Sequence, residues 1–147
     1  MMISAKNFLS DDEKNAVVSA IRAIESNTSG EIRIHIDDSC SEDVLDRAVQ
    51  VFHHLKMDQT AFRNGVLIYI AVRDKQFAII GDKGINKKID EDYWKSISYQ
   101  MQQNFIRESP SKAIINAVHQ IGKTLSTHFP DLDKFDKNEL PDEISFE

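Results

Sequence analysis

The segment that most restricts the fold is Val66-Leu67-Ile68-Tyr69-Ile70-Ala71-Val72, which shows no polar alternation. It is rich in β-branched residues and is bounded by Asn64-Gly65 and Arg73-Asp74, a pattern typical of a strand between two turns. A strand of this kind is usually buried on both faces of its sheet. The fold must therefore cover that sheet from two sides.

Periodicity and turn signals predict the other elements. Ser10 and Glu13 form a capping box at the start of a helix from about Asp11 to Glu25. Ile32, Ile34 and Ile36 then alternate with polar residues, which predicts a strand near a sheet edge or with one exposed face. Further along, we expect a helix capped by Ser41 with an apolar stripe over Val44–Leu55, a hairpin strand at Phe77–Ile80, a helix that ends near Glu108, and a helix opened by Ser109-Pro110 and closed by Pro130.

The predicted order α-β-α-β-β-α-α is most simply satisfied by a three-layer α/β/α sandwich, a small mixed sheet with helices on both faces. Residues 1–130 would form this domain. Residues 131–147 are acidic and weakly apolar, so we expect a loosely held tail from which Leu140, Ile144 and Phe146 could dock.

Charge and cysteine usage narrow the range of partners. The 147 residues include 18 Lys and Arg against 24 Asp and Glu, a net charge of −6, which disfavours nucleic acid as a partner. The single Cys40 excludes an internal disulfide and a multi-cysteine zinc site. Met1–Leu9 has no long apolar core, so neither a secretory signal nor a membrane span is expected there. We expect a soluble, cytoplasmic protein.

Acidic and amide side chains gather at the two ends of the predicted sheet. Parallel first and second strands with an antiparallel third place Glu31, Asn64 and Asp82 together, beside three glycine-containing turns. Carboxylate and amide oxygens of this kind suit a hard cation such as calcium. In an alternative interpretation, the glycines only permit tight turns and the acids are solvated.

The opposite end of the sheet is the second choice for a metal site. It gathers Asp37, Asp38 and Asp74 outside the carboxyl ends of the parallel strands, where open α/β sheets often bind ligands. No histidine has a serine, a cysteine or a second histidine at a recognisable catalytic spacing, so catalytic residues stay unassigned.

Several segments in this order resemble the TPM-domain family. They are Leu9–Glu13, Thr28–Ile34, Arg63–Ala71 and Phe77–Ile85, and the Asn-Gly-apolar strand followed by a Gly-x-x-Gly turn is the most specific part. The family includes thylakoid-lumen acid-phosphatase-like proteins, proteins associated with photosystem II repair and many bacterial proteins. The resemblance implies an α/β/α sandwich, binding of divalent cations (chiefly calcium) and, in plant members, a weak acid phosphatase activity.

The resemblance also bears on individual residues. Asn64, Asp82 and Gly84 fall within the shared motifs. Many members carry a glutamate two residues after the second glycine, where this chain has Asn86, so one carboxylate is missing. Many relatives also carry a signal peptide and a membrane anchor, so this chain resembles a short, soluble branch of the family.

Three functions follow as hypotheses. The first is a calcium-binding accessory or binding module, with magnesium as the second cation and Glu31, Asn64, Asp82 and Asp90 around the ion. The second is slow, metal-assisted hydrolysis of a phosphomonoester, in which Lys83 would offset developing charge. The third is an interaction scaffold that binds a protein partner through the acidic surface and the tail.

Overall fold

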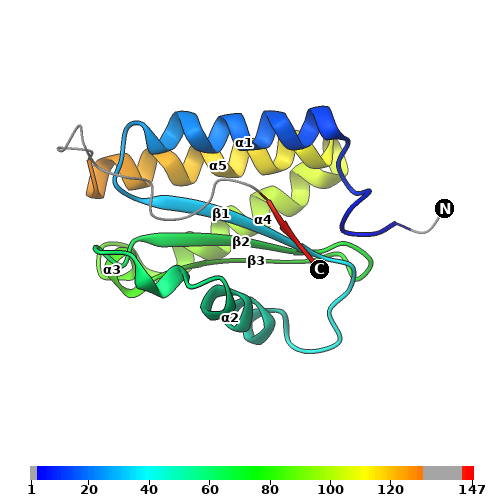
Figure 1. Cartoon of the computed structure of the whole chain (residues 1–147), viewed down its shortest axis with the longest axis horizontal. Helices are drawn as coiled ribbons and strands as arrows, with labels where there is room; N and C mark the ends of the chain where they lie inside the picture. The colour runs from blue at the N-terminus through cyan, green and yellow to red at the C-terminus, as the bar shows by residue number, and fades with distance from the viewer. Residues whose placement is uncertain (1–2, 131–143) are drawn as a thin grey trace.

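The computed structural model describes residues 3–130 and 144–147, and its elements form three layers (Figure 1). Within these ranges the central layer is a four-stranded sheet in the order β3-β2-β1-β4, with β1 Glu31–Asp37, β2 Gly65–Ala71, β3 Gln76–Gly81 and β4 Ser145–Phe146. The helices are α1 Asp11–Glu25, α2 Val44–His54, α3 Lys83–Asn86, α4 Glu91–Arg107 and α5 Pro110–His128, with a 3-10 helix η1 at Met57–Gln59. The expected α/β/α arrangement is confirmed.

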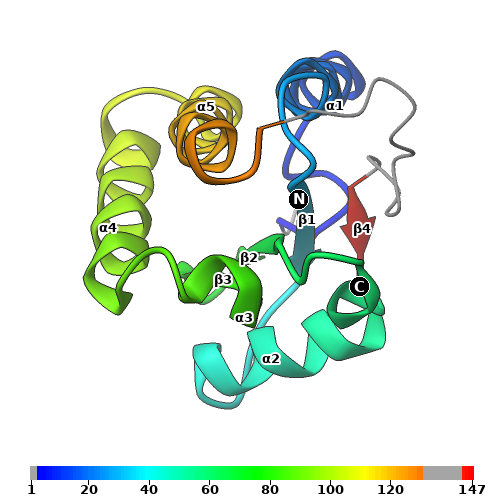
Figure 2. The ribbon, with the colours of Figure 1, turned by 90° about the vertical axis from the view of Figure 1, so that its left-hand side faces the viewer.

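Each face of the sheet has its own hydrophobic core. From Val66 onwards, the even-numbered residues of β2 pack in a core with α1, α4 and α5, and the odd-numbered ones pack in a core with α2. Figure 2 shows α1 and α5 beyond one face of the sheet and α2 beyond the other. All of β2 is buried, as a strand without polar alternation requires.

The strand register defines two ends of the sheet. β1 and β2 are parallel, with Glu31 opposite Gly65 and Asp37 opposite Ala71. β3 returns antiparallel to β2, and just after it the Asp82 N–H donates to the Gly65 carbonyl at 2.9 Å. The starts of β1 and β2 and the end of β3 therefore lie together at one end, called the amino end here. Asp37, Ala71 and the β2–β3 turn lie at the other, the carboxyl end.

β1 lies one strand from the edge of the sheet, as expected, but the expectation of an exposed face is wrong. β4 pairs parallel to its outer side, with His35 opposite Ser145 and Ile36 opposite Phe146. His35 is 1 % and Asp37 4 % exposed. Their polar atoms can be buried because they form hydrogen bonds with one another and with neighbouring elements. The alternation of polar and apolar residues does not reveal such partners.

The end of the chain takes part in this sheet. Ile144 belongs to the core on the α1 side and Phe146 packs against it, whereas Leu140 lies outside the described residues.

The helix ends follow local chemistry, with one correction. The Ser10 hydroxyl accepts the Glu13 N–H at 3.1 Å and the Glu13 carboxylate accepts the Ser10 N–H at 2.8 Å, which confirms the capping box. α2 is capped by Asp43 and not by Ser41, because the Asp43 carboxylate accepts the Leu45 N–H at 2.9 Å. Both residue types are good caps, so the local sequence does not choose between them. None of the described helices is long and apolar enough to cross a bilayer.

Candidate functional site

Three of the predicted metal ligands meet at the amino end. Glu31 lies opposite Gly65 on β1, and Asp82 lies opposite the same glycine on the β3 side. Paired residues of neighbouring strands share a face of the sheet, so the register assigns Glu31, and by continued alternation Asp82, to the face that α2 covers. Gly65 has no side chain to separate them. Asn64 precedes Gly65, and its carbonyl accepts the Glu31 N–H at 3.4 Å. Glu31, Asn64 and Asp82 are called the amino-end cluster below.

The cluster is buried. Glu31 is 3 %, Asn64 1 % and Asp82 6 % exposed. A carboxylate taken out of water needs a compensating positive charge or hydrogen bonds, because its desolvation is costly. Two buried carboxylates in one small region therefore favour a cation nearby.

One such cation belongs to the chain itself. The Arg63 Nε donates to Asp82 Oδ2 at 2.7 Å and its Nη2 to Asp82 Oδ1 at 3.0 Å. These hydrogen bonds raise the pKa of the Arg63 guanidinium further above its usual value. Asp82 Oδ1 also accepts the Lys83 N–H at 2.8 Å, so Asp82 caps the short helix α3. Asp82 is thus held on several sides.

Other oxygens near β2 lack a partner. The Asn64 amide donates to the Ser29 hydroxyl at 3.2 Å, but Asn64 Oδ1 is buried without a hydrogen bond to any described residue. The same is true of Thr60 Oγ1, in the segment that leads into β2. An unpaired buried acceptor costs about 1–3 kcal/mol, so such atoms indicate a ligand or a bound water.

The remaining candidates near this end have structural partners. The Asp90 carboxylate accepts the Tyr93 N–H at 3.1 Å and caps α4. Asn86 donates to the Gly81 carbonyl at 2.8 Å and accepts the Trp94 indole N–H at 2.8 Å. Asn86 therefore fastens α3 to β3 and α4, a role for which an amide is better suited than a carboxylate because it both donates and accepts.

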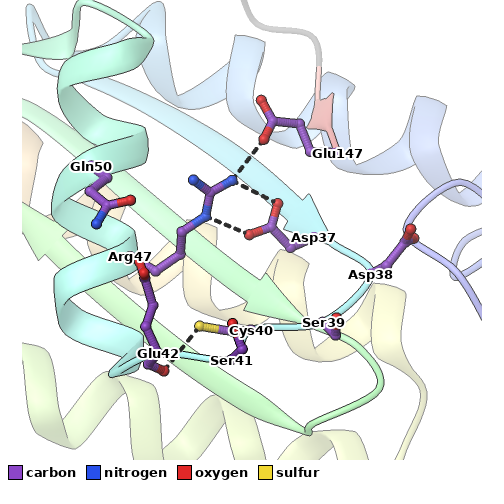
Figure 3. A pocket seen from close by; sticks show the side chains of 9 residues that line it. All are labelled: Asp37, Asp38, Ser39, Cys40, Ser41, Glu42, Arg47, Gln50 and Glu147. Atoms are coloured by element: carbon purple, nitrogen blue, oxygen red, sulfur yellow. Dashed lines mark hydrogen bonds and ion pairs between the residues drawn. The ribbon is translucent and has the colours of Figure 1, made fainter.

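The carboxyl end holds a second buried acid, Asp37. Its carboxylate accepts hydrogen bonds from the Tyr69 hydroxyl at 2.5 Å and from Arg47 Nε at 2.9 Å, and His35 Nε2 lies 2.8 Å from it. Arg47 Nη2 also donates to the Glu147 carboxylate at 2.7 Å (Figure 3). These five residues, His35, Asp37, Arg47, Tyr69 and Glu147, are called the carboxyl-end cluster.

The electrostatics of this cluster keep Asp37 ionised. Burial by itself raises the pKa of the Asp37 carboxyl, but the hydrogen bonds from Arg47, Tyr69 and His35 outweigh burial and leave the pKa below its usual value. Burial and the hydrogen bond to Asp37 raise the pKa of the Tyr69 hydroxyl, which stays protonated as a donor. The cluster is a hydrogen-bonded network in which Arg47 lies between the carboxylates of Asp37 and Glu147.

A polar cavity opens beside this network. It has a volume of about 330 Å³ and is lined by Asp37, Asp38, Ser39, Cys40, Ser41, Glu42, Arg47, Gln50 and Glu147 (Figure 3). One ligand atom from each of His35, Asp37 and Glu147 lies within 4.8 Å of the others, a spacing that could hold a metal ion. The Arg47 guanidinium, however, already bridges Asp37 and Glu147. A metal ion there would first have to displace that arginine.

The other acids predicted for this end are not gathered around one point. Asp38 accepts the Ala5 N–H at 2.6 Å, and Figure 3 shows its side chain pointing away from Asp37 and Arg47. Asp74 accepts the Cys40 N–H at 2.5 Å. Both carboxylates fasten neighbouring loops.

Sequence reasoning missed the partners of Asp37. Arg47 lies on the predicted helix and Tyr69 on the predicted buried strand. A polar side chain on an otherwise apolar element needs a buried partner, and this was the signal in the sequence that could have pointed to Asp37. Glu147 is 110 positions from Asp37 in the chain, and no local pattern points to it.

Comparison with known proteins places the chain in a family. The TPM domain model matches residues 2–124. The NMR structure of BA42 from the psychrophilic bacterium Bizionia argentinensis has 45 % identity and a TM-score of 0.87, with 95 % of this chain and 96 % of that chain covered.

Two more distant solution structures share the fold. The N-terminal domain of a protein from P. gingivalis has 13 % identity and a TM-score of 0.69, over 83 % of this chain and 79 % of that one. The N-terminal domain of cg2496 from Corynebacterium glutamicum has 12 % identity and a TM-score of 0.64, over 81 % and 75 %. Comparison with curated proteins gives no match. On the family model and the similarity to BA42, the chain belongs to the TPM-domain family.

Proposed function

We propose that this TPM domain is a binding module for a divalent cation, calcium first and magnesium second, at the amino-end cluster. The single observation that carries the proposal is the pair of buried carboxylates, Glu31 and Asp82, on either side of a glycine that puts no side chain between them. Oxygen ligands in flexible geometry are what calcium prefers.

The amino-end cluster supplies carboxylate and amide oxygens from buried side chains. Glu31 and Asp82 carry two negative charges, and the guanidinium of Arg63 bonds to Asp82. Asn64 Oδ1 supplies a neutral, buried acceptor next to the strand pair. Glu31 and Asp82 would hold the ion, Asn64 would add an amide oxygen, and water would complete the shell. Asp90 is a weaker candidate because it caps α4.

The carboxyl end is less suited to the same ion. Asp37 is held by the side chains of Arg47, Tyr69 and His35, whereas the side-chain contact of Asp82 is the fork from Arg63. Arg47 also carries a positive charge between Asp37 and Glu147. Coulomb repulsion from this arginine would weaken the binding of a divalent cation beside it.

The experiment is an NMR titration of ¹⁵N-labelled protein with calcium and then magnesium, with affinities from calorimetry. We expect saturable shifts confined to residues 29–31, 63–65 and 82–86. Glu31→Gln keeps the shape of the side chain and removes its charge, so it should weaken calcium binding about tenfold, or about 1.4 kcal/mol.

The matched control is Asp74→Asn, which removes one carboxylate at the opposite end and should leave the affinity unchanged. Shifts confined to residues 37–42 and 73–74 would move the site to the carboxyl end. No shift at either end at millimolar calcium would refute the proposal and favour a protein-binding role.

A further inference from the structure

We propose that Arg63 is an internal competitor for the cation site, a built-in positive charge that must leave Asp82 before a divalent cation can use that carboxylate. The inference rests on the proposed function, and it adds a residue that sets the affinity and couples binding to a side-chain movement.

The first support is the way the two side chains meet. Arg63 bonds to both oxygens of Asp82, at 2.7 and 3.0 Å. A fork of this kind covers the carboxylate edge that a metal ion would otherwise approach. While the fork occupies both oxygens, a metal ion cannot bind Asp82 through both of them, so the guanidinium and a bidentate metal compete for this carboxylate.

The second support is the difference in exposure. The Asp82 side chain is 5 % exposed, whereas that of Arg63 is 36 % exposed. The acid is fixed in the fold, because its carboxylate also accepts the Lys83 N–H and caps α3. The arginine reaches it from the surface, so its guanidinium can turn back into water once a metal ion supplies the positive charge that the buried Asp82 needs.

The third support is the rigid backbone that carries Arg63. The Gly84 N–H donates to the Arg63 carbonyl at 2.8 Å, and a Cβ on Gly84 would lie only 2.1 Å from the Phe62 carbonyl oxygen. Arg63 itself has a φ of 50°, in the left-handed region. Close packing against Gly84 holds this loop, so a rotation of the side chain, rather than a shift of the loop, opens Asp82.

The fourth support is a second place for the guanidinium. The charge of Asp58 also raises the pKa of Arg63, which puts that acid within electrostatic reach. Asp58 lies in η1 and its side chain is 30 % exposed. Arg63 would exchange Asp82 for Asp58 and water when the cation binds.

Arg47 at the carboxyl end shows the contrast. It bonds to two acids, Asp37 and Glu147, and its side chain is only 26 % exposed. Asp37 is further held by Tyr69 and His35. Arg47 is held by two carboxylates and is a fixed part of the fold, whereas Arg63 is held by one carboxylate and can leave it.

The test compares calcium affinities by calorimetry in the full chain. Arg63→Gln removes the competing charge and should bind calcium about tenfold more tightly than the native protein, since 1.4 kcal/mol corresponds to tenfold. Arg63→Lys keeps the charge but lacks the fork, and should fall between the two. The control Arg73→Gln makes the same charge change at the carboxyl end, where Arg73 donates to the Ile3 carbonyl, and should leave the affinity as it is.

A readout on the native protein guards against a variant that fails to fold. The Arg63 Nε–H signal should move during the calcium titration as it leaves Asp82, while the Arg47 Nε–H signal stays. If native protein binds calcium and the Arg63 signal does not move, or Arg63→Gln binds no more tightly, the competitor role is refuted and the cation site stands. If neither native protein nor Arg63→Gln binds calcium, the proposed function fails and this inference fails with it.

Discussion

At the scale of single residues, the hydroxyl of Tyr69 is the contact most easily tested. It donates to Asp37 Oδ2 at 2.5 Å from a fully buried ring that also stacks on His35, with 6.1 Å between ring centroids. Tyr69→Phe keeps the ring and leaves the carboxylate one donor short. We expect the free energy of unfolding to fall by about 1.5–3 kcal/mol, the range for a hydrogen bond to a charged group.

Urea unfolding at pH 7 measures this difference. Tyr99→Phe is the matched control, because Tyr99 is 62 % exposed. An equal, small effect of both substitutions would show that the hydroxyl of Tyr69 adds little to the network.

At the scale of elements, β4 is short but completes the sheet. The Asp38 N–H donates to the Glu147 carbonyl at 3.0 Å, and the Glu147 N–H donates to the Ile36 carbonyl at 3.0 Å. Removal of residues 144–147 turns β1 into an edge strand and exposes these groups. It also removes the buried Ile144, so we expect a loss of at least about 2 kcal/mol in stability.

Hydrogen exchange locates the effect of that truncation. The Asp38 amide should exchange much faster in the truncated protein, because its acceptor is gone. The Val72 amide, which donates to the Asp37 carbonyl at 3.1 Å, keeps its partner and serves as the internal control. Unchanged protection of Asp38 would show that β4 does not hold this edge in solution.

The elements also show where sequence reasoning works. The capping box at Ser10, the buried strand after Asn64 and the Ser109-Pro110 helix start are each set by short-range chemistry, and each is confirmed. β4 has only two residues in an acidic segment, so strand propensity does not predict it; it forms because it pairs with β1, which is distant in the chain. The polar face of β1 is likewise buried by contacts with segments that are distant in the sequence.

At the scale of the whole molecule, the gathering of residues at two ends of the sheet was predictable because it depends only on strand direction. The pairing of each buried aspartate with an arginine was not predictable from strand direction. Arg63 and Asp82 are 19 positions apart, on either side of the β2–β3 hairpin, and Arg47 and Asp37 are 10 positions apart, across the loop from β1 into α2. Strand direction fixes which segments meet, whereas side-chain reach and burial decide which charges are neutralised.

The acid stability of the molecule follows from one of these pairs. The pKa of Asp37 is below its usual value in the folded state, so the unfolded chain binds a proton more readily. Its contribution to stability is therefore fully present above the unfolded pKa of about 3.9, and it is lost as the pH falls through the lower, folded pKa.

Asp37→Asn removes this titration. We expect the native protein to be clearly more stable than Asp37→Asn at pH 7 and the difference to shrink below about pH 4. Urea unfolding between pH 7 and pH 3 measures it, with the exposed Asp12→Asn as a control that stays close to native throughout. A difference that stays constant over this range would show that Asp37 has the same pKa folded and unfolded, and that Arg47 and Tyr69 do not stabilise its charge.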